Sequence, residues 1–165
     1  MTTIRPLSAE DGPELYEFET KNRSHFARSV PDRGDGFFTN FDDRLEHLLV
    51  EQEAGVDLFF IVRDDGGAVI GRVNLIDVND GVAHLGYRIA EAATGRGHAK
   101  AAVRLVLDEA RMVGIERIRA MTTVDNNASR RVLEACGFTP ASGAPAMVEG
   151  HGGQMKEAVH YERQV

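Results

Sequence analysis

Residues His84 to Val113 read HLGYRIAEAATGRGHAKAAVRLVLDEARMV, and this stretch decides the fold. It begins with residues that alternate in polarity, as in a β-strand that buries one face. A short linker and the turn Gly95-Arg96-Gly97 follow, and the sequence then takes up helical apolar spacing between Val103 and Val113. The stretch therefore predicts a strand, a glycine loop and a helix in succession.

The glycine loop has the character of a phosphate-binding turn. Gly95 and Gly97 lack a Cβ atom, so backbone N–H groups can approach a ligand there and lead into the N-terminus of the helix. Two familiar loops do not match. A Walker loop needs Ser or Thr where Ala101 stands, and a dinucleotide loop needs glycine in place of Lys100. A turn that binds nothing remains the simplest alternative.

Further strands are predicted on both sides of this stretch. Apolar runs and turn residues indicate an antiparallel meander of strands at 58–62, 68–78 and 82–89, the last of which leads to the glycine loop. A strand at 117–123 follows the helix, and this order predicts a right-handed parallel crossover. A short first strand is expected at 3–5.

The N-terminal part of the chain is predicted to be mainly helical. Ser8-Ala9-Glu10-Asp11 has the form of a capping box that begins a helix. Thr39 is the predicted N-cap of a second helix. Between them, residues 22–36 show no steady period, and we expect exposed side chains there, Asn22 and Phe26 among them, to shape a substrate mouth.

Length and composition fit one domain. The chain has 165 residues and 42% apolar content, enough to bury an ordinary core. We expect residues 1–165 to form a single domain of the mixed α/β class. Its central mixed sheet should contain about seven strands flanked by helices, antiparallel in the first half and parallel across the connecting helix.

Charge and composition exclude several classes of protein. A net charge of −7 argues against broad binding to nucleic acids or anionic membranes, because both require many uncompensated Lys and Arg side chains. No apolar run approaches the roughly 20 residues that cross a bilayer, and no signal-like segment is present, so we expect a cytoplasmic protein. The histidines lack paired metal spacing and Cys136 is the only cysteine, so we expect no metal site.

A second motif follows the 117–123 strand. It consists of Asn126-Asn127-Ala128-Ser129, then Arg131-Val132-Leu133-Glu134, then Gly137-Phe138. Together with the loop Gly95-Arg96-Gly97-His98-Ala99, it resembles the GNAT superfamily of N-acetyltransferases, and it is most similar to the ribosomal-protein-alanine N-acetyltransferase branch. The resemblance covers nearly the whole chain and implies acetyl-CoA as cosubstrate.

The resemblance also implies where acetyl-CoA binds. Backbone N–H groups of the glycine loop would hold the pyrophosphate, and the pantetheine arm would lie like an extra strand beside residues 85–89. Arg131 or Arg130 would approach a CoA phosphate. Thr94 departs from the family, whose loop usually begins with Gln or Arg, so one side-chain contact is missing there. The residues expected to contact acetyl-CoA are Leu85, Tyr87, Ile89, Thr94, Gly95, Arg96, Gly97, His98, Ala99, Asn126 and Arg131.

Acetyl transfer to an amine needs a base, a polarised carbonyl and a proton for the departing thiolate. By resemblance, Ser129 protonates the thiolate, Asn126 contacts pantetheine, and a strand N–H near Ile89 holds the carbonyl. His84 stands where relatives often carry Glu, so we take it as the candidate base. Each also has an ordinary alternative: an exposed helix serine, a helix N-cap and a surface histidine.

The leading acceptor, by resemblance, is the N-terminal alanine of a protein. Two alternatives stay open. One is a small amine such as an amino acid, a polyamine or an antibiotic, and the other is a CoA-binding sensor without turnover. The expected partners are acetyl-CoA and the amine acceptor, and the expected assembly is a monomer or a homodimer.

Overall fold

The computed structural model describes residues 1–142 and 146–165, which contain eight strands in one sheet. The strand order is β1-β2-β3-β4-β5-β8-β6, and β7 pairs with β8. Neighbouring strands are antiparallel except β4 and β5, which run parallel. The strands are β1 (Thr3–Pro6), β2 (Leu58–Arg63), β3 (Val69–Asn79), β4 (Val82–Ile89), β5 (Arg117–Thr123), β6 (Thr139–Pro140), β7 (Ala146–Glu149) and β8 (Met155–Gln164).

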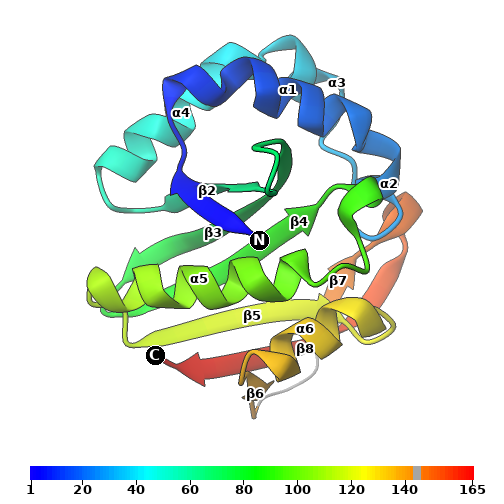
Figure 1. Ribbon diagram of the computed structural model, residues 1–165. Helices are drawn as coiled ribbons and strands as arrows, with labels where there is room; N and C mark the ends of the chain where they lie inside the picture. The colour runs from blue at the N-terminus through cyan, green and yellow to red at the C-terminus, as the bar shows by residue number, and fades with distance from the viewer. Residues whose placement is uncertain (143–145) are drawn as a thin grey trace.

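Helices cover the two faces of the sheet. Figure 1 shows α1 and α4 on one side of it and α5 on the other, with α6 close to α5. The helices in the described residues are α1 (Gly12–Lys21), α2 (Arg23–Ala27), α3 (Asp35–Thr39), α4 (Phe41–Glu53), α5 (His98–Met112) and α6 (Asn127–Ala135), with 3₁₀ turns η1 (Ala9–Asp11), η2 (Glu91–Ala93) and η3 (His151–Gly153). The mixed α/β class is confirmed. The sheet has eight strands rather than about seven because β6 and β7 both pair with β8.

The crossover predicted around the glycine loop is also confirmed. Helix α5 connects β4 to β5, and the two strands pair in parallel. Val103 and Val106 of α5 are fully buried against the sheet, as the apolar spacing of the helix predicts.

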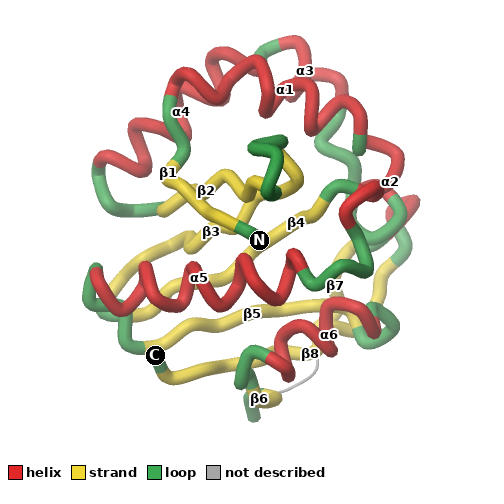
Figure 2. The backbone as a smooth tube through the Cα atoms, in the orientation of Figure 1, coloured by secondary structure: helices red, strands yellow, loops and turns green. Residues whose placement is uncertain are grey.

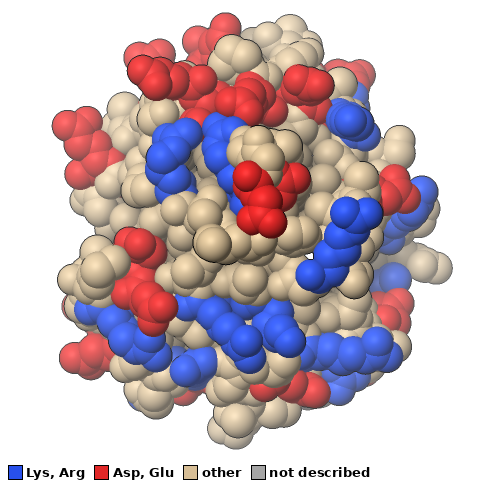
Figure 3. Space-filling view, in the orientation of Figure 1, with Lys and Arg blue, Asp and Glu red and all other residues tan. Residues whose placement is uncertain are grey.

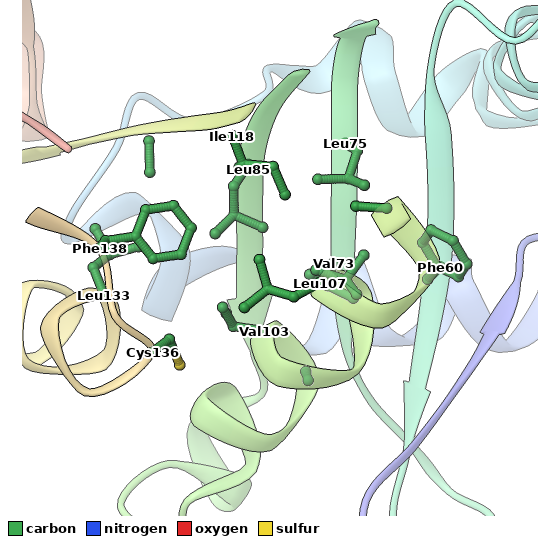
Figure 4. Close-up of a cluster of buried hydrophobic side chains, with 14 of the residues drawn as sticks. Phe60, Val73, Leu75, Leu85, Val103, Leu107, Ile118, Leu133, Cys136 and Phe138 are labelled. Atoms are coloured by element: carbon green, nitrogen blue, oxygen red, sulfur yellow. The ribbon is translucent and has the colours of Figure 1, made fainter. Parts of the chain in front are cut away.

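Two apolar cores lie on opposite faces of the sheet, and β2 contributes to both. Phe60 and Val62 belong to the core under α5 and α6, whereas Phe59 and Ile61 belong to the core under α1 and α4. Successive strand residues point to opposite faces, so this dense apolar run serves both layers. Figure 4 shows the first core, in which Val103 and Leu107 of α5 lie among side chains of β3 and β4.

Of two predictions about the N-terminal helices, one is correct and one is wrong. The capping box is confirmed, because Ser8 N donates to Asp11 Oδ2 at 2.8 Å. The predicted N-cap of the second helix is wrong by one residue. Thr39 ends the short helix α3, and Asn40 precedes α4.

The expected exposure of the 22–36 segment is wrong for two of its residues. Asn22 is buried, and its side chain donates to Phe18 O at 2.9 Å and accepts from Glu91 N at 2.9 Å. Phe26 is also buried, and its ring packs against Phe18 and under the guanidinium of Arg88. Helix α2 therefore packs on the sheet instead of forming an open rim.

A buried ionic cluster fixes α1 to β3 and β4. Glu19 is 1% exposed, and its carboxylate accepts hydrogen bonds from Arg33, Arg72 and Arg88 at 3.1 to 3.4 Å. Burial lowers the pKa of Arg72, and burial together with the charge of Arg33 lowers the pKa of Arg88 to about 10. Glu19 opposes both effects, so removing this carboxylate would leave buried positive charge without a partner.

Two further features bear on the classes of site. Among the described residues, no helix has the length and apolar character that a membrane crossing requires. The same residues contain no group of three or more His, Cys, Asp or Glu side chains placed to hold a metal ion.

Candidate active site

A cleft opens where β4 and β5 separate. The two strands pair only from Val82 to His84 against Arg117 to Arg119, and beyond these residues they diverge, as Figure 2 shows. The cleft has a volume of about 300 Å³. Its lining residues are Ser29, Val30, Leu85, Gly86, Tyr87, Ala120, Met121, Thr122, Thr123, Asn126, Ser129, Leu133, Val148 and Glu149.

The separation leaves one edge of β4 open. Ala90 N donates to Ile70 O of β3 at 2.8 Å. Because hydrogen bonding to a neighbouring strand alternates, every second residue of β4 counted back from Ala90 also turns its main-chain groups towards β3. The main-chain groups of Tyr87 and Ile89 therefore face the opened side, and Leu85 lies where the strands part. An extended ligand can add to such an edge through main-chain hydrogen bonds. The structure thus places these three predicted residues along the open edge of β4, where Leu85 and Tyr87 also line the cleft.

The glycine loop presents main-chain N–H groups at the start of α5. Gly95 and Gly97 have φ angles of 74° and 82°, which favour glycine, and Gly97 is the N-cap of the helix. The first helical bond runs from Ala101 N to Gly97 O, at 3.0 Å. Within the described residues, the N–H groups of His98 and Ala99 have no main-chain acceptor, so this helix end can receive an anion.

Two side chains of the loop are already engaged with the protein. The Thr94 hydroxyl donates to Glu91 O at 2.7 Å, and His98 Nδ1 and Thr2 Oγ1 share a hydrogen bond of 2.9 Å. Arg96 is exposed. The geometry therefore offers the backbone of this loop, rather than the Thr94 and His98 side chains, to a phosphate.

The two candidate arginines on α6 have different surroundings. Arg130 donates to Tyr161 OH at 3.2 Å and to Val124 O at 3.1 Å, so it joins α6 to the sheet. Arg131 is exposed, and no hydrogen bond to another described residue holds its side chain. Figure 3 shows Lys and Arg side chains gathered over α5 and α6 on this face of an otherwise acidic protein. Of the two, only Arg130 is held by other described residues, and the guanidinium of Arg131 faces solvent.

The second motif places a pair of hydroxyl groups in the cleft. Asn126 is the N-cap of α6, where its Oδ1 accepts from Ser129 N at 3.1 Å. This cap orients the first turn of α6 so that Ser129 Oγ lies 2.9 Å from Tyr87 OH. Burial raises the pKa of Tyr87, which keeps the phenol protonated at neutral pH. The structure therefore joins two residues that the sequence analysis assigned to separate roles.

His84 lies on the other side of the sheet from this hydroxyl pair. It is exposed, it belongs to the paired part of β4, and its side chain points to the face opposite that of Tyr87. The structure does not bring His84 to Ser129. His84 shares a face of β4 with Gly86, which lines the cleft, and with Arg88, which packs on Phe26 of α2.

Four polar residues of the cleft, Ser29, Thr122, Thr123 and Glu149, were not identified from the sequence. Thr122 of β5 and Glu149 of β7 both line it. The alternation of the 117–123 strand shows which residues share a face with Thr122, but not that the strand borders a cleft. Glu149 lies in a glycine-rich segment without a motif, so the sequence carries no signal for it.

Comparison with known proteins adds independent findings. Residues 2–139 match the family model described as an acetyltransferase (GNAT) domain. The probable N-acetyltransferase YjcK of Bacillus subtilis (strain 168) is 32% identical over 145 residues, which cover 82% of this chain and 78% of that protein.

Solved structures share the fold over almost the entire chain. Ribosomal-protein-S5-alanine acetyltransferase from Vibrio fischeri has a TM-score of 0.90 at 23% identity, over 99% of this chain and 92% of that chain. RimJ of Mycobacterium smegmatis, solved in complex with CoA-disulfide, has a TM-score of 0.86 at 23% identity, over 99% of this chain and 82% of that chain.

Proposed function

This chain belongs to the GNAT family of acetyl-CoA-dependent acetyltransferases, and we propose that it acetylates the N-terminal α-amine of a protein that begins with alanine. We propose further that residues 1–165 act as one acetyltransferase domain. The observation that carries the proposal is the Tyr87–Ser129 hydroxyl pair, 2.9 Å apart, inside the cleft between β4 and β5.

Acetyl-CoA would bind along the open edge of β4. Its pyrophosphate would accept hydrogen bonds from the backbone of residues 95–99, and Arg131 would meet another phosphate. From there the pantetheine arm would run back beside Ile89 and Tyr87 towards Leu85. This path supports a thioester close to the hydroxyl pair, because Tyr87 belongs both to the open edge and to the pair.

The hydroxyl pair supplies the proton that the leaving group needs. As the amine nitrogen bonds to the acetyl carbon and the C–S bond breaks, the electron pair passes to sulfur and Ser129 Oγ gives its proton to the thiolate. Tyr87 OH can then donate its proton to Ser129 Oγ across their 2.9 Å contact, and Tyr87 regains a proton from solvent in the open cleft. A free N–H of β4 near Ile89 would stabilise the charge that develops on the carbonyl oxygen.

The amine must lose a proton on the acceptor side of the sheet. His84 is our candidate base from the sequence, and Glu149 is a second candidate because it lines the cleft directly. An α-amine has a reference pKa near 7.7–8.0, whereas a lysine amine has one near 10.4, so an α-amine makes the smaller demand on either base. This difference supports an N-terminal acceptor over a lysine side chain.

The borders of the cleft support an acceptor that extends into solvent. Ser29 and Val30, which follow α2, are exposed, and Glu149 of β7 is exposed beside them. A peptide chain can leave the cleft between these two segments, while its first residue remains at the reaction centre. The proposed acceptor is also the one named for a protein of the same fold, a ribosomal-protein-S5-alanine acetyltransferase. The sequence expectation of a cytoplasmic enzyme is part of this proposal.

Mass spectrometry of products tests the proposal. The protein is incubated with acetyl-CoA and a panel of amines: a peptide that begins with alanine, the same peptide with a blocked N-terminus and an internal lysine, free amino acids, spermidine and an aminoglycoside. We expect acetylation of the alanine peptide and none of the blocked peptide. Faster acetylation of a small amine would replace the protein acceptor with a small-molecule one. Binding of CoA without acetyl release from any member would favour a sensor.

A further inference from the structure

Thr122 has a buried side chain whose hydroxyl has no hydrogen-bond partner among the described residues. The residue is 8% exposed and lines the cleft from β5. Arg119 pairs with His84, so continuing this parallel register places Thr122 level with Tyr87, across the opening between the strands. Thr122 shares a face of β5 with Ala120, which belongs to the core under α5 and α6. It therefore lies on the same side of the sheet as the hydroxyl pair.

The hydroxyls of Tyr87, Ser129 and Thr123 near the opening already have partners, and Ser29, which also lines the cleft, is exposed to solvent. Tyr87 and Ser129 bond to each other, and Thr123 Oγ1 donates to Asp125 Oδ1 at 2.8 Å. In the described residues, His25 Nδ1 and Asn74 Oδ1 are the side-chain polar atoms that are buried and lack a hydrogen-bond partner. Thr122 Oγ1 is not among them, so this hydroxyl of a buried residue reaches solvent through the cleft.

An unpaired hydroxyl in such a site is suited to a ligand. The Thr122 hydroxyl is open to the cleft and has no partner within the described residues, so it can hydrogen-bond to a ligand group without breaking a contact within the protein. Threonine also occupies a strand position where valine would pack equally well, because β5 and its neighbour Val159 of β8 are otherwise apolar on this face. Packing alone therefore does not need the hydroxyl, which leaves it available to a ligand.

We propose that the Thr122 hydroxyl donates a hydrogen bond to the sulfur of acetyl-CoA and stabilises the thiolate as the C–S bond breaks. This inference rests on the proposed function. A thioester that follows the edge of β4 to Tyr87 passes between β4 and β5. The hydroxyl pair would then flank it at β4, and Thr122 would flank it at β5. Ser129 transfers its proton to sulfur, whereas Thr122 keeps its own proton and lowers the energy of the charged sulfur through its hydrogen bond.

Turnover of two Thr122 variants gives the first test. Thr122→Val has nearly the shape of threonine without the hydroxyl, and it should lower kcat by about 10- to 100-fold. The affinity for acetyl-CoA, measured by calorimetry, should change by less than about threefold, because the hydrogen bond strengthens only as charge develops. Thr122→Ser should recover most of the lost kcat. A folded Thr122→Val enzyme with the kcat of the natural protein would overturn the proposal.

A disulfide reaction locates the sulfur without requiring turnover. In Thr122→Cys, the new thiolate should attack the disulfide of oxidised CoA, form a mixed disulfide and release one CoA thiolate. The natural Cys136 provides the background, since it is 2% exposed and burial raises the pKa of its thiol. Thr139→Cys, at an exposed position, serves as the matched control.

Acetyl-CoA distinguishes a specific reaction from a random one. We expect excess acetyl-CoA to slow adduct formation in Thr122→Cys at least tenfold and to leave Thr139→Cys unchanged. Absence of the Thr122→Cys adduct, or an adduct that acetyl-CoA does not slow, would overturn the contact. If the contact is found but no amine is acetylated, then the proposed acceptor fails and the sulfur site stands.

Discussion

Ser129→Ala should lower kcat by about 10²–10⁴-fold and leave the affinity for acetyl-CoA nearly unchanged. Ser129 Oγ lies 2.9 Å from Tyr87 OH in the cleft, and its proton is needed only when the thiolate departs. At 1.36 kcal/mol for each tenfold change, this loss corresponds to about 2.7–5.4 kcal/mol in the activation barrier.

The same substitution should leave the fold intact. The N-cap of α6 uses the main-chain N–H of Ser129, which donates to Asn126 Oδ1 at 3.1 Å and remains in Ser129→Ala. Loss of the hydroxyl contact costs roughly 1 kcal/mol of stability, which is small beside the roughly 5–15 kcal/mol of a typical domain. A slow but folded enzyme would therefore report on proton transfer.

Two further variants complete the experiment. Tyr87→Phe keeps the packed ring and removes only its hydroxyl, so its kcat should fall by less than that of Ser129→Ala. Because the two hydroxyls act in one relay, the double variant should be no more than about twofold slower than Ser129→Ala. Release of free thiol from acetyl-CoA at saturating amine measures kcat, and calorimetry measures affinity. Full activity of Ser129→Ala, or losses that multiply in the double variant, would refute the relay.

Three other predictions concern cofactor binding, the base and stability. Gly97→Val should weaken CoA and acetyl-CoA by at least tenfold in calorimetry, whereas Gly114→Val, with the same φ of 82° at the far end of α5, should cost stability alone; equal affinities would remove the loop from the site. Profiles of kcat/KM from pH 6 to 9.5 should identify the base. Loss of the acidic limb in His84→Ala and not in Glu149→Gln would support His84. Loss of that limb only in Glu149→Gln would assign the base to Glu149. Glu19→Ala should lower the free energy of unfolding by about 3–5 kcal/mol in urea titrations, because it leaves buried arginines unpaired; a change below about 1 kcal/mol would contradict that account of the cluster.

The organising part of the fold could be predicted because its signals are local. Alternation in residues 82–89, the glycines of the loop and the spacing in α5 each act over a few residues, and the structure has strand, loop and helix in that order. The N-cap chemistry of Asn126 is also local, and its side chain does cap α6.

Features that depend on distant contacts were missed. Asn22 and Phe26 read as exposed because their segment has no period, yet Asn22 is held by Glu91, which lies far along the chain. The Tyr87–Ser129 contact joins residues 42 positions apart, and it forms only because β4 and β5 diverge and α6 reaches into the opening. No local pattern describes that divergence.

The cleft residues Thr122 and Glu149 illustrate the same limit. Threonine is common in strands, so Thr122 reads as ordinary until the register of β5 places it opposite Tyr87. Glu149 is brought to the cleft by the pairing of β7 with β8, from a segment whose sequence has no motif. Chemistry that is assembled by sheet topology requires the structure.

The most direct test of the acetyltransferase account uses one peptide with two amines. The peptide begins with alanine and contains one internal lysine, and fragment mass spectrometry locates the acetyl group after incubation with the protein and acetyl-CoA. We predict a single acetyl group on the N-terminal amine, formed at a rate that falls by about 10²–10⁴-fold with Ser129→Ala. Acetylation of the lysine with a free N-terminus, or no acetylation while free amines of other classes react, would contradict the account.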